Sequence, residues 1–175
     1  YRPISLLPIL SKLLEILFQK RLMNIVESRK LIPNHQFGFR KEHGTIEQIR
    51  RLVEEIHSAF DTKKYRSGVF IDIAQAFDKV WHQGLFFKLK NLLPINYYLF
   101  LQSYLSNRQF MVRHGDSTSL LQPIAAGVPQ GSVLGPILYL LYTSDLTTSN
   151  NVLTITFDDD TAVLSTTDQT NLASS

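Results

Sequence analysis

Cysteine is absent from the 175-residue sequence, and so are several patterns that identify other classes of protein. Without cysteine, the chain has neither a disulfide framework nor a thiolate metal site. No run of ~18 uncharged apolar residues occurs, so we expect no membrane-spanning segment. There is also no internal repeat, no low-complexity segment and no linker rich in Pro, Gly and Ser. These absences favour one globular domain, or a piece of a larger one.

The residues that are present describe a globular chain with an uneven charge. Apolar residues make up 44% of the sequence, which is enough to build a core. Residues 1–66 carry 13 Lys/Arg and 7 Asp/Glu, a net +6, whereas residues 67–175 carry 5 and 8, a net −3. This charge asymmetry suits a protein that binds polyanions at one part and metal ions at another. The alternative is that it arises by chance. The sequence begins at Tyr1 without a signal-peptide pattern, and we expect an excerpt from a longer polypeptide.

Residues 154–164 carry the strongest local signal, because two β-prone runs flank Asp158, Asp159 and Asp160. The alternation of apolar and polar residues predicts a hairpin with the three acids at its tip. Adjacent like charges repel each other, and hard divalent cations bound through carboxylate oxygens would remove that cost. An acidic, solvated turn is the alternative, because Asp is favoured in turns.

A further acidic residue interrupts a short apolar run. Residues 69–73 predict a buried strand, and Asp72 lies within it. A carboxylate in such a strand is costly unless it is paired, protonated or metal-bound. A hydrogen-bonded structural aspartate is the alternative. Asp78 follows where a helix or turn begins, and we expect it to act as a cap.

Helical spacing and turn residues predict the other elements. A helix is expected over residues 10–22, with Glu15 and Gln19 on its polar face. Thr45, as N-cap, and Gln48 form a capping-box pattern that opens a second, core-packing helix. The remaining expectations are a polar turn at residues 63–68, helices before Pro94 and at residues 96–105 and 137–146, and strands at residues 109–113 and 120–124.

Two loops contain residues suited to ligand binding. Residues 35–41, HQFGFRK, combine aromatic rings with Arg40 and a lysine, a composition that can stack a base and hold phosphates. A surface loop with anchoring aromatics is the simpler interpretation of this segment alone. In the Gly/Pro-rich residues 127–136, Gly131 permits close approach of a ligand and Gln130 offers an amide. This loop lacks the lysine of a Walker loop, and a plain strand-to-helix connection is its alternative.

The acidic residues converge if the strand with Asp72 and the hairpin are neighbours in one sheet. Asp72, Asp159 and Asp160 would then hold two Mg²⁺ ions roughly 3.5–4 Å apart, an arrangement used for in-line displacement at phosphorus. One ion would activate a primer 3′-hydroxyl, and the other would stabilise the leaving pyrophosphate. A metal-dependent nuclease or another phosphoryl-transfer enzyme is a weaker alternative, which the aspartate cluster alone permits.

The chain carries five motifs that are specific in combination and in order. They are YRPISLL at residues 1–7, QFGFR at 36–40, FIDIAQAFD at 70–78, GVPQGSVLGP at 127–136 and FDDD at 157–160. Together they resemble the reverse transcriptase domain of non-LTR retrotransposons, close to the jockey-like group of insect elements. The resemblance implies an α+β fold of fingers and palm, a mostly antiparallel sheet backed by helices. We expect residues 1–66 to form a fingers-like basic part and residues 67–175 the palm.

The resemblance also implies which residues carry the metal ions of an RNA-directed DNA polymerase. Asp72, Asp159 and Asp160 match the family's metal-binding positions, and the carbonyl of Ile73 would assist them. Two Mg²⁺ ions are implied, with Mn²⁺ as a substitute. The implied partners are an RNA template, a DNA primer, dNTPs and the remainder of a parent polyprotein, and no membrane is involved.

Further matched positions concern the incoming nucleotide. Phe77 falls at the family's steric-gate position, where a bulky ring excludes a ribose 2′-hydroxyl and so selects deoxynucleotides. Gln130 and Gly131 would line the nucleotide pocket. Arg2 and Arg40 would contact the triphosphate or the template.

The sequence departs from the family pattern at three places. Asp158 stands where the family usually has Ala, and His43, Gly44 and Thr45 replace His-Ser-Thr. The later palm motifs and the thumb do not follow the hairpin. A third carboxylate beside the metal ions adds repulsion. An inactive or co-opted retrotransposon remnant with residual nucleic-acid binding is therefore the alternative to an active polymerase.

Overall fold

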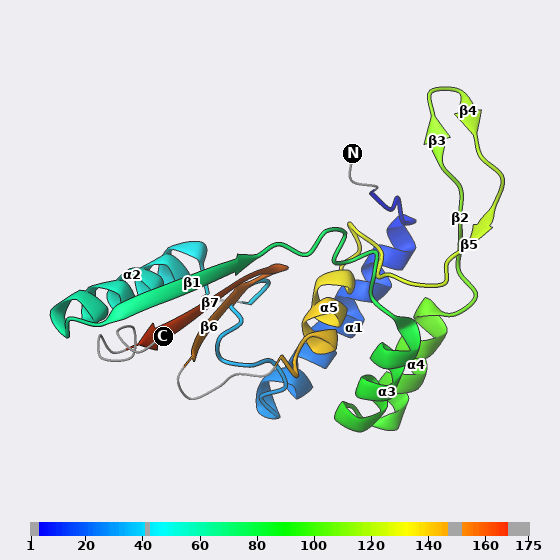
Figure 1. Ribbon diagram of the computed structural model, residues 1–175. Helices are drawn as coiled ribbons and strands as arrows, with labels where there is room; N and C mark the ends of the chain where they lie inside the picture. Colours follow the sequence, from blue (N-terminus) through cyan, green and yellow to red (C-terminus); the bar gives the residue numbers. More distant parts are fainter. Residues whose placement is uncertain (1–3, 41–42, 147–151, 168–175) are drawn as a thin grey trace. The chain divides into compact units, whose positions relative to one another are not determined.

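The computed structural model describes residues 4–40, 43–146 and 152–167 (Figure 1). Arg2, a predicted nucleotide contact, lies outside the described residues. The chain divides into two compact units, each built from two separate stretches of sequence. The first comprises Tyr1–Ile32 and Gln75–Ser144, and the second comprises Pro33–Ala74 and Asp145–Ser175. The division into fingers and palm at residue 66 stays a prediction.

Helices dominate the first unit. They are α1 (Ile9–Ser28), α3 (His82–Leu92), α4 (Ile95–Leu105) and α5 (Gly135–Tyr142). Pro94 separates α3 from α4, as predicted, because a proline cannot donate a hydrogen bond inside a helix. α5 begins and ends earlier than the predicted helix at residues 137–146, and Pro136 lies in its first turn, where the missing N–H is tolerated. Within the described residues, no helix is long and apolar enough to cross a membrane.

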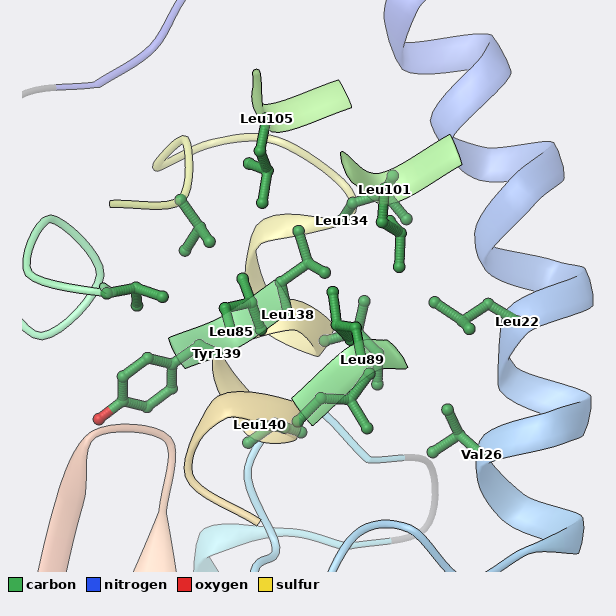
Figure 2. Packing of buried hydrophobic residues seen from close by; sticks show 14 of the residues in the cluster. Leu22, Val26, Leu85, Leu89, Leu101, Leu105, Leu134, Leu138, Tyr139 and Leu140 are labelled. Carbon is green, nitrogen blue, oxygen red and sulfur yellow. The ribbon is translucent and has the colours of Figure 1, made fainter. Parts of the chain in front are cut away.

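Leucine side chains from these helices form the core of the first unit (Figure 2). α5 has the sequence GPILYLLY, without a charged residue, and six of its eight residues are buried. α3 and α4 pack side by side through residues with helical spacing. The fully buried leucines are Leu22, Leu85, Leu89, Leu101, Leu105, Leu134, Leu138, Leu140 and Leu141.

The face that α1 buries differs from the predicted one. Leu13 and Leu17 are exposed, whereas Glu15 is only 1% exposed and Gln19 is half-buried. The Glu15 carboxylate accepts hydrogen bonds from the N–H groups of Val133 (2.7 Å) and Leu134 (3.2 Å), which lie just before α5. A helix N-terminus has unpaired N–H groups and attracts negative charge, so an acid on the inward face is stabilising there.

Replacing Glu15 by Ala should lower the free energy of unfolding by roughly 1–3 kcal/mol, because two N–H donors lose their acceptor. Urea denaturation of the whole chain measures this difference. Glu27→Ala, at an exposed position of the same helix, is the matched control and should have little effect. Equal stabilities of the two variants would contradict this role of Glu15.

A hairpin-like arm extends from the helices of the first unit (Figure 1). Its strands pair as β2 (Gln109–Phe110) with β5 (Gln122–Pro123) and β3 (Arg113–His114) with β4 (Ser117–Thr118). Gly115 has φ +58° at the turn between β3 and β4, which suits glycine. The predicted strand pair is therefore present, although it is broken into shorter segments.

The second unit is a three-stranded antiparallel sheet with one helix. The strand order is β1 (Tyr65–Ile71), β7 (Asp160–Thr167) and β6 (Val152–Phe157). Helix α2 (Thr45–Asp61) packs against β1 and β6. A small core is formed by Ile155, Ala162 and Leu164, with Leu52 of α2 against it. The mixture of helices and antiparallel strands in both units confirms the predicted α+β class.

Strand β1 differs from the sequence prediction in two respects. It begins at Tyr65, so most of the predicted polar turn at residues 63–68 belongs to the strand. Its residues are exposed except for the half-buried Arg66, and Asp72 is also exposed. The prediction of a buried strand was wrong. An apolar run indicates that a strand tends to be buried, but it does not show whether another element covers it. The cost of a buried carboxylate is therefore no argument for metal binding by Asp72.

Helix α2 starts at Thr45, one residue earlier than predicted, and its capping is shifted by the same step. Gly44 is the N-cap, and its N–H donates to the carboxylate of Glu47 (2.7 Å). Gln48 is buried instead of capping. The apolar side chains predicted to pack into the core are largely exposed, among them Ile46, Ile49, Val53 and Phe60.

Candidate active site

The acidic hairpin forms as predicted. β6 ends at Phe157, β7 begins at Asp160, and the two strands pair in register around the turn of Asp158 and Asp159. Asp158 has φ +56°, a left-handed conformation that aspartate tolerates better than most residues. Asp159 is half-buried and Asp160 is exposed, so both carboxylates have access to solvent and to ions.

Strand pairing brings Asp72 to the same end of the sheet. β1 pairs with β7 in antiparallel orientation, and Ile71 faces Thr161. Asp72 follows Ile71 and Asp160 precedes Thr161, so the two acids occupy the next position along this pair of strands. The predicted neighbourhood of the first acidic strand and the hairpin is thus present in the backbone. Ile73, whose carbonyl was predicted to assist, comes directly after Asp72.

The side chains of these acids do not form a closed metal site. Among the described residues, no group of three His, Cys, Asp or Glu side chains is arranged to hold an ion. Like charges repel each other, so neighbouring carboxylates separate unless a cation lies between them. Oxygen donors at one end of a sheet still fit a hard divalent cation, because such ions prefer carboxylate and carbonyl ligands.

Asp158 has an unusual electrostatic environment. Burial, followed by the charges of Asp159 and Asp160, raises its pKa from 3.8 to about 6. Its Oδ1 atom is buried and has no hydrogen-bond partner. A buried polar atom without a partner is costly, and a positive charge at the hairpin tip would relieve this cost together with the repulsion.

A group of predicted nucleotide contacts lies in the first unit. Phe77 is half-buried, and its ring stacks on Tyr139 with centroids 4.8 Å apart and planes at 27°. The Gln130 side chain donates to Asp78 Oδ2 (3.1 Å). Asp78 lies in a turn and caps no helix, so the capping prediction was wrong. The hydrogen bond between Gln130 and Asp78 was not predicted from the sequence. The available signal was that the acid and the amide lie in two of the five motifs.

Glycines in the loop of residues 127–131 allow the backbone to approach its neighbours. Gly127 has φ +90°, and a Cβ atom there would lie 2.8 Å from the Asp78 carbonyl oxygen. Gly131 has φ +88° and faces Ile4. The Ser5 N–H donates to the Gln130 carbonyl (2.8 Å). The structure therefore brings together residues from the first, third and fourth sequence motifs around Gln130.

Arg40 has a local role in the second unit. Its Nη1 atom donates to the carbonyls of Pro33 (3.3 Å) and Gln36 (3.1 Å). These bonds stabilise the loop of the second motif. The predicted contact of Arg40 with a triphosphate or template stays a prediction.

The chain is similar to polymerases of mobile elements. A family profile described as "Reverse transcriptase (RNA-dependent DNA polymerase)" matches residues 1–174. The chain is 52% identical over 172 residues to the "Probable RNA-directed DNA polymerase from transposon BS" of Drosophila melanogaster. It is 49% identical over 172 residues to the "RNA-directed DNA polymerase from mobile element jockey" of the same species. Each match covers 94% of this chain, which spans 19% of the length of either relative.

A solved structure supports the same assignment of the fold. Telomerase from Candida tropicalis, in complex with a fragment of telomeric RNA, matches with a TM-score of 0.60 and 13% identity. The match covers 94% of this chain and 30% of the telomerase chain, and it confirms the predicted reverse transcriptase-type fold. Reverse transcriptases generally use divalent metal ions and a nucleic-acid template with a primer. The relatives include the jockey element, to whose group the motifs pointed, and the chain belongs to the reverse transcriptase (RNA-dependent DNA polymerase) family.

Proposed function

We propose that this chain contains the polymerase centre of an RNA-directed DNA polymerase of a non-LTR retrotransposon. The centre adds dNTPs to the 3′-hydroxyl of a DNA primer on an RNA template. The observation that carries the proposal is the strand register, in which Asp72 and the Asp159–Asp160 pair lie at one end of one sheet. The names of the relatives, which are RNA-directed DNA polymerases of mobile elements, support it.

Asp72, Asp159 and Asp160 would hold two Mg²⁺ ions, or Mn²⁺, with the Ile73 carbonyl as a further oxygen ligand. When bound, such ions supply a Lewis acid for the 3′-hydroxyl and neutralise charge on the pyrophosphate. The protein's contribution is the position of the carboxylates, because Asp160 begins β7 and Asp72 and Asp159 each lie next to the end of a paired strand. Asp72 and Asp160 are exposed and Asp159 is half-buried, which leaves room for substrate and water ligands.

The first unit would bind and select the nucleotide. Phe77 is fixed by its stack on Tyr139, so its ring would resist displacement by a ribose 2′-hydroxyl. Gln130, fixed by Asp78, and Gly131 would line the pocket beside the nucleotide. Arg2 and Arg40 are the proposed contacts to the triphosphate or the template.

Primer extension on an RNA template tests the proposal. The chain should be examined alone and as a chimaera, in which it replaces the matching segment of the jockey polymerase. Extension by the chimaera with Mg²⁺ and dNTPs is the expected result. An inactive chimaera that also fails after Asp158→Ala would contradict the proposal, since that variant restores the residue usual in the family.

One observation favours an inactive remnant as the alternative. The Asp158 carboxyl is partly buried beside Asp159 and Asp160, where it repels both. We expect Asp158→Ala to raise the rate of extension by the chimaera on the order of tenfold. A factor of ten corresponds to about one pKa unit of electrostatic repulsion between Asp158 and its two neighbours. The rate at saturating dNTP and varied Mg²⁺ measures this effect. An unchanged rate would show that the third carboxylate is harmless.

The pKa of Asp158 also predicts a pH dependence of stability in metal-free buffer. An unfolded carboxyl ionises near 3.8, whereas the folded chain keeps Asp158 protonated up to about pH 6. The unfolded state therefore loses its proton first, and stability falls as the pH rises between these values. The Tm of Asp158→Ala relative to the wild type should increase from about pH 4 to pH 6 and then stay constant. A difference that does not change with pH would contradict the raised pKa.

A further inference from the structure

The loop of residues 35–38 lies along the outer edge of β6, next to the acidic hairpin. β6 is an edge strand, because the strand order is β1, β7, β6. Gln36 forms a parallel bridge with Thr156, in which the Thr156 N–H donates to the His35 carbonyl (3.0 Å) and the Phe37 N–H donates to the Thr156 carbonyl (3.0 Å). The loop thus pairs with β6 two residues before Asp158.

The Gln36 side chain connects this loop to the hairpin tip. It is 5% exposed, and both ends of its amide are used. Oε1 accepts from the Gly38 N–H (2.8 Å), and Nε2 donates to the Asp158 carbonyl (3.2 Å). Asp158 has a left-handed backbone, which costs a non-glycine residue roughly 1 kcal/mol and persists only where its surroundings hold it. The Gln36 amide supplies a side-chain hydrogen bond to the backbone of this residue.

Gly38 brings the loop into direct contact with the tip. A Cβ atom at residue 38 would overlap the backbone nitrogen and Oδ1 of Asp158 and would lie 2.7 Å from its Cα. Only glycine is compatible with this approach without movement of the hairpin. The contact restricts where the turn of Asp158 and Asp159 can lie.

Gln48 holds the same loop from helix α2. Its side chain is 4% exposed, and Nε2 donates to the carbonyls of His35 (2.8 Å) and Thr156 (2.8 Å). Its Oε1 accepts from Arg51 (3.1 Å), whose guanidinium lies over the Phe37 ring at 5.1 Å. Two buried glutamines therefore join the helix, the loop and the hairpin through hydrogen bonds.

We propose that Gln36 and Gln48 are positioning residues that hold the aspartate hairpin in the conformation needed to bind divalent cations. The inference rests on the proposed function, because it concerns the same carboxylates. Gln36 acts through the Asp158 backbone, which precedes Asp159, and Gln48 acts through the loop. Outer groups that orient metal ligands typically contribute roughly 10- to 100-fold to metal affinity.

Binding of Mn²⁺ to the chain, followed by the EPR signal of the free ion, tests this inference without an activity assay. Gln36→Met removes the amide at similar length and should weaken Mn²⁺ binding roughly 10- to 100-fold. Gln48→Met should weaken Mn²⁺ binding less than Gln36→Met does. It is the variant that tests the inference if Gln36→Met fails to fold. Leu52→Ala is the matched control, because it opens the core beside Ile155 without touching the hairpin tip. It should lower stability and leave Mn²⁺ affinity unchanged.

The outcomes separate this inference from the proposed function. If Asp159→Ala abolishes Mn²⁺ binding but both glutamine variants bind as the wild type does, the positioning role is wrong and the metal site stands. Equal weakening by Leu52→Ala would show a general effect of stability and would also overturn the role. If Asp159→Ala binds as well as the wild type, both proposals fail. In the extension assay, Gln36→Met should raise the Mg²⁺ concentration required, with less than about a twofold change in KM for dNTPs.

Discussion

Primer extension should be abolished by Asp159→Ala, with a rate reduced about 10³-fold or more. Metal ions bound to carboxylates contribute several kcal/mol of transition-state stabilisation, and each 1.36 kcal/mol is tenfold in rate. Asp159 is half-buried in the turn between β6 and β7, at the end of the sheet that Asp72 also reaches. The rate of dNTP incorporation by the chimaera, measured in single turnover with saturating template and primer, gives the effect on the chemical step.

Asp116→Ala is the matched control for this experiment. Asp116 is also a turn aspartate, but it is exposed and lies between β3 and β4 in the arm of the first unit. Its replacement should leave extension unchanged. Extension that survives Asp159→Ala at the Mg²⁺ concentration that just saturates the wild type would refute the metal assignment, because the reaction would then not need this carboxylate.

Ribonucleotide exclusion should be lost in Phe77→Val. The Phe77 ring stacks on Tyr139 and is therefore held in one orientation. Valine is shorter and would leave room for a ribose 2′-hydroxyl, and pocket differences of this size are worth roughly 10- to 200-fold in discrimination. We expect the ratio of kcat/KM for dNTP over rNTP to fall by about that factor. The activity with dNTPs should decrease far less.

Phe110→Val is the control for the Phe77 variant. Phe110 is an exposed phenylalanine of β2 in the arm, and the proposed mechanism gives it no contact with the nucleotide. It should leave the ratio unchanged. A Phe77→Val enzyme that rejects rNTPs as the wild type does would remove the steric-gate assignment and leave the metal site unaffected.

Sequence patterns predicted the elements that depend on local chemistry. The β6–β7 hairpin, the break between α3 and α4 at Pro94 and the helix after Pro136 follow from alternation and from the missing N–H of proline. The neighbourhood of Asp72 and the hairpin was also predicted, from the requirement that repelling acids share cations. The identity of the metal ligands stays a prediction.

Patterns did not predict which face of an element is covered. In α1 the polar Glu15 points inward and Leu13 points outward, because the unpaired N–H groups before α5 lie on the inner side. In α2 Gln48 is buried because it bonds to His35 and Thr156, which are distant in sequence. In both helices a hydrogen-bond partner from another element determines which polar side chain is buried. Amphipathic spacing within one helix contains no information about that partner.

The interleaving of the two units has a consequence for synthesis on the ribosome. β1 ends at Ile71, and its partner β7 begins only at Asp160. At the usual pace of ~5–20 residues per second, a nascent β1 waits roughly 5–20 s for that partner, with Val69 and Phe70 available for incorrect pairing. Helices α3, α4 and α5 follow one another within residues 82–142, so they can pack together before β7 is synthesised. Slow completion of the sheet should therefore make the nascent chain dependent on chaperones until the last strand emerges.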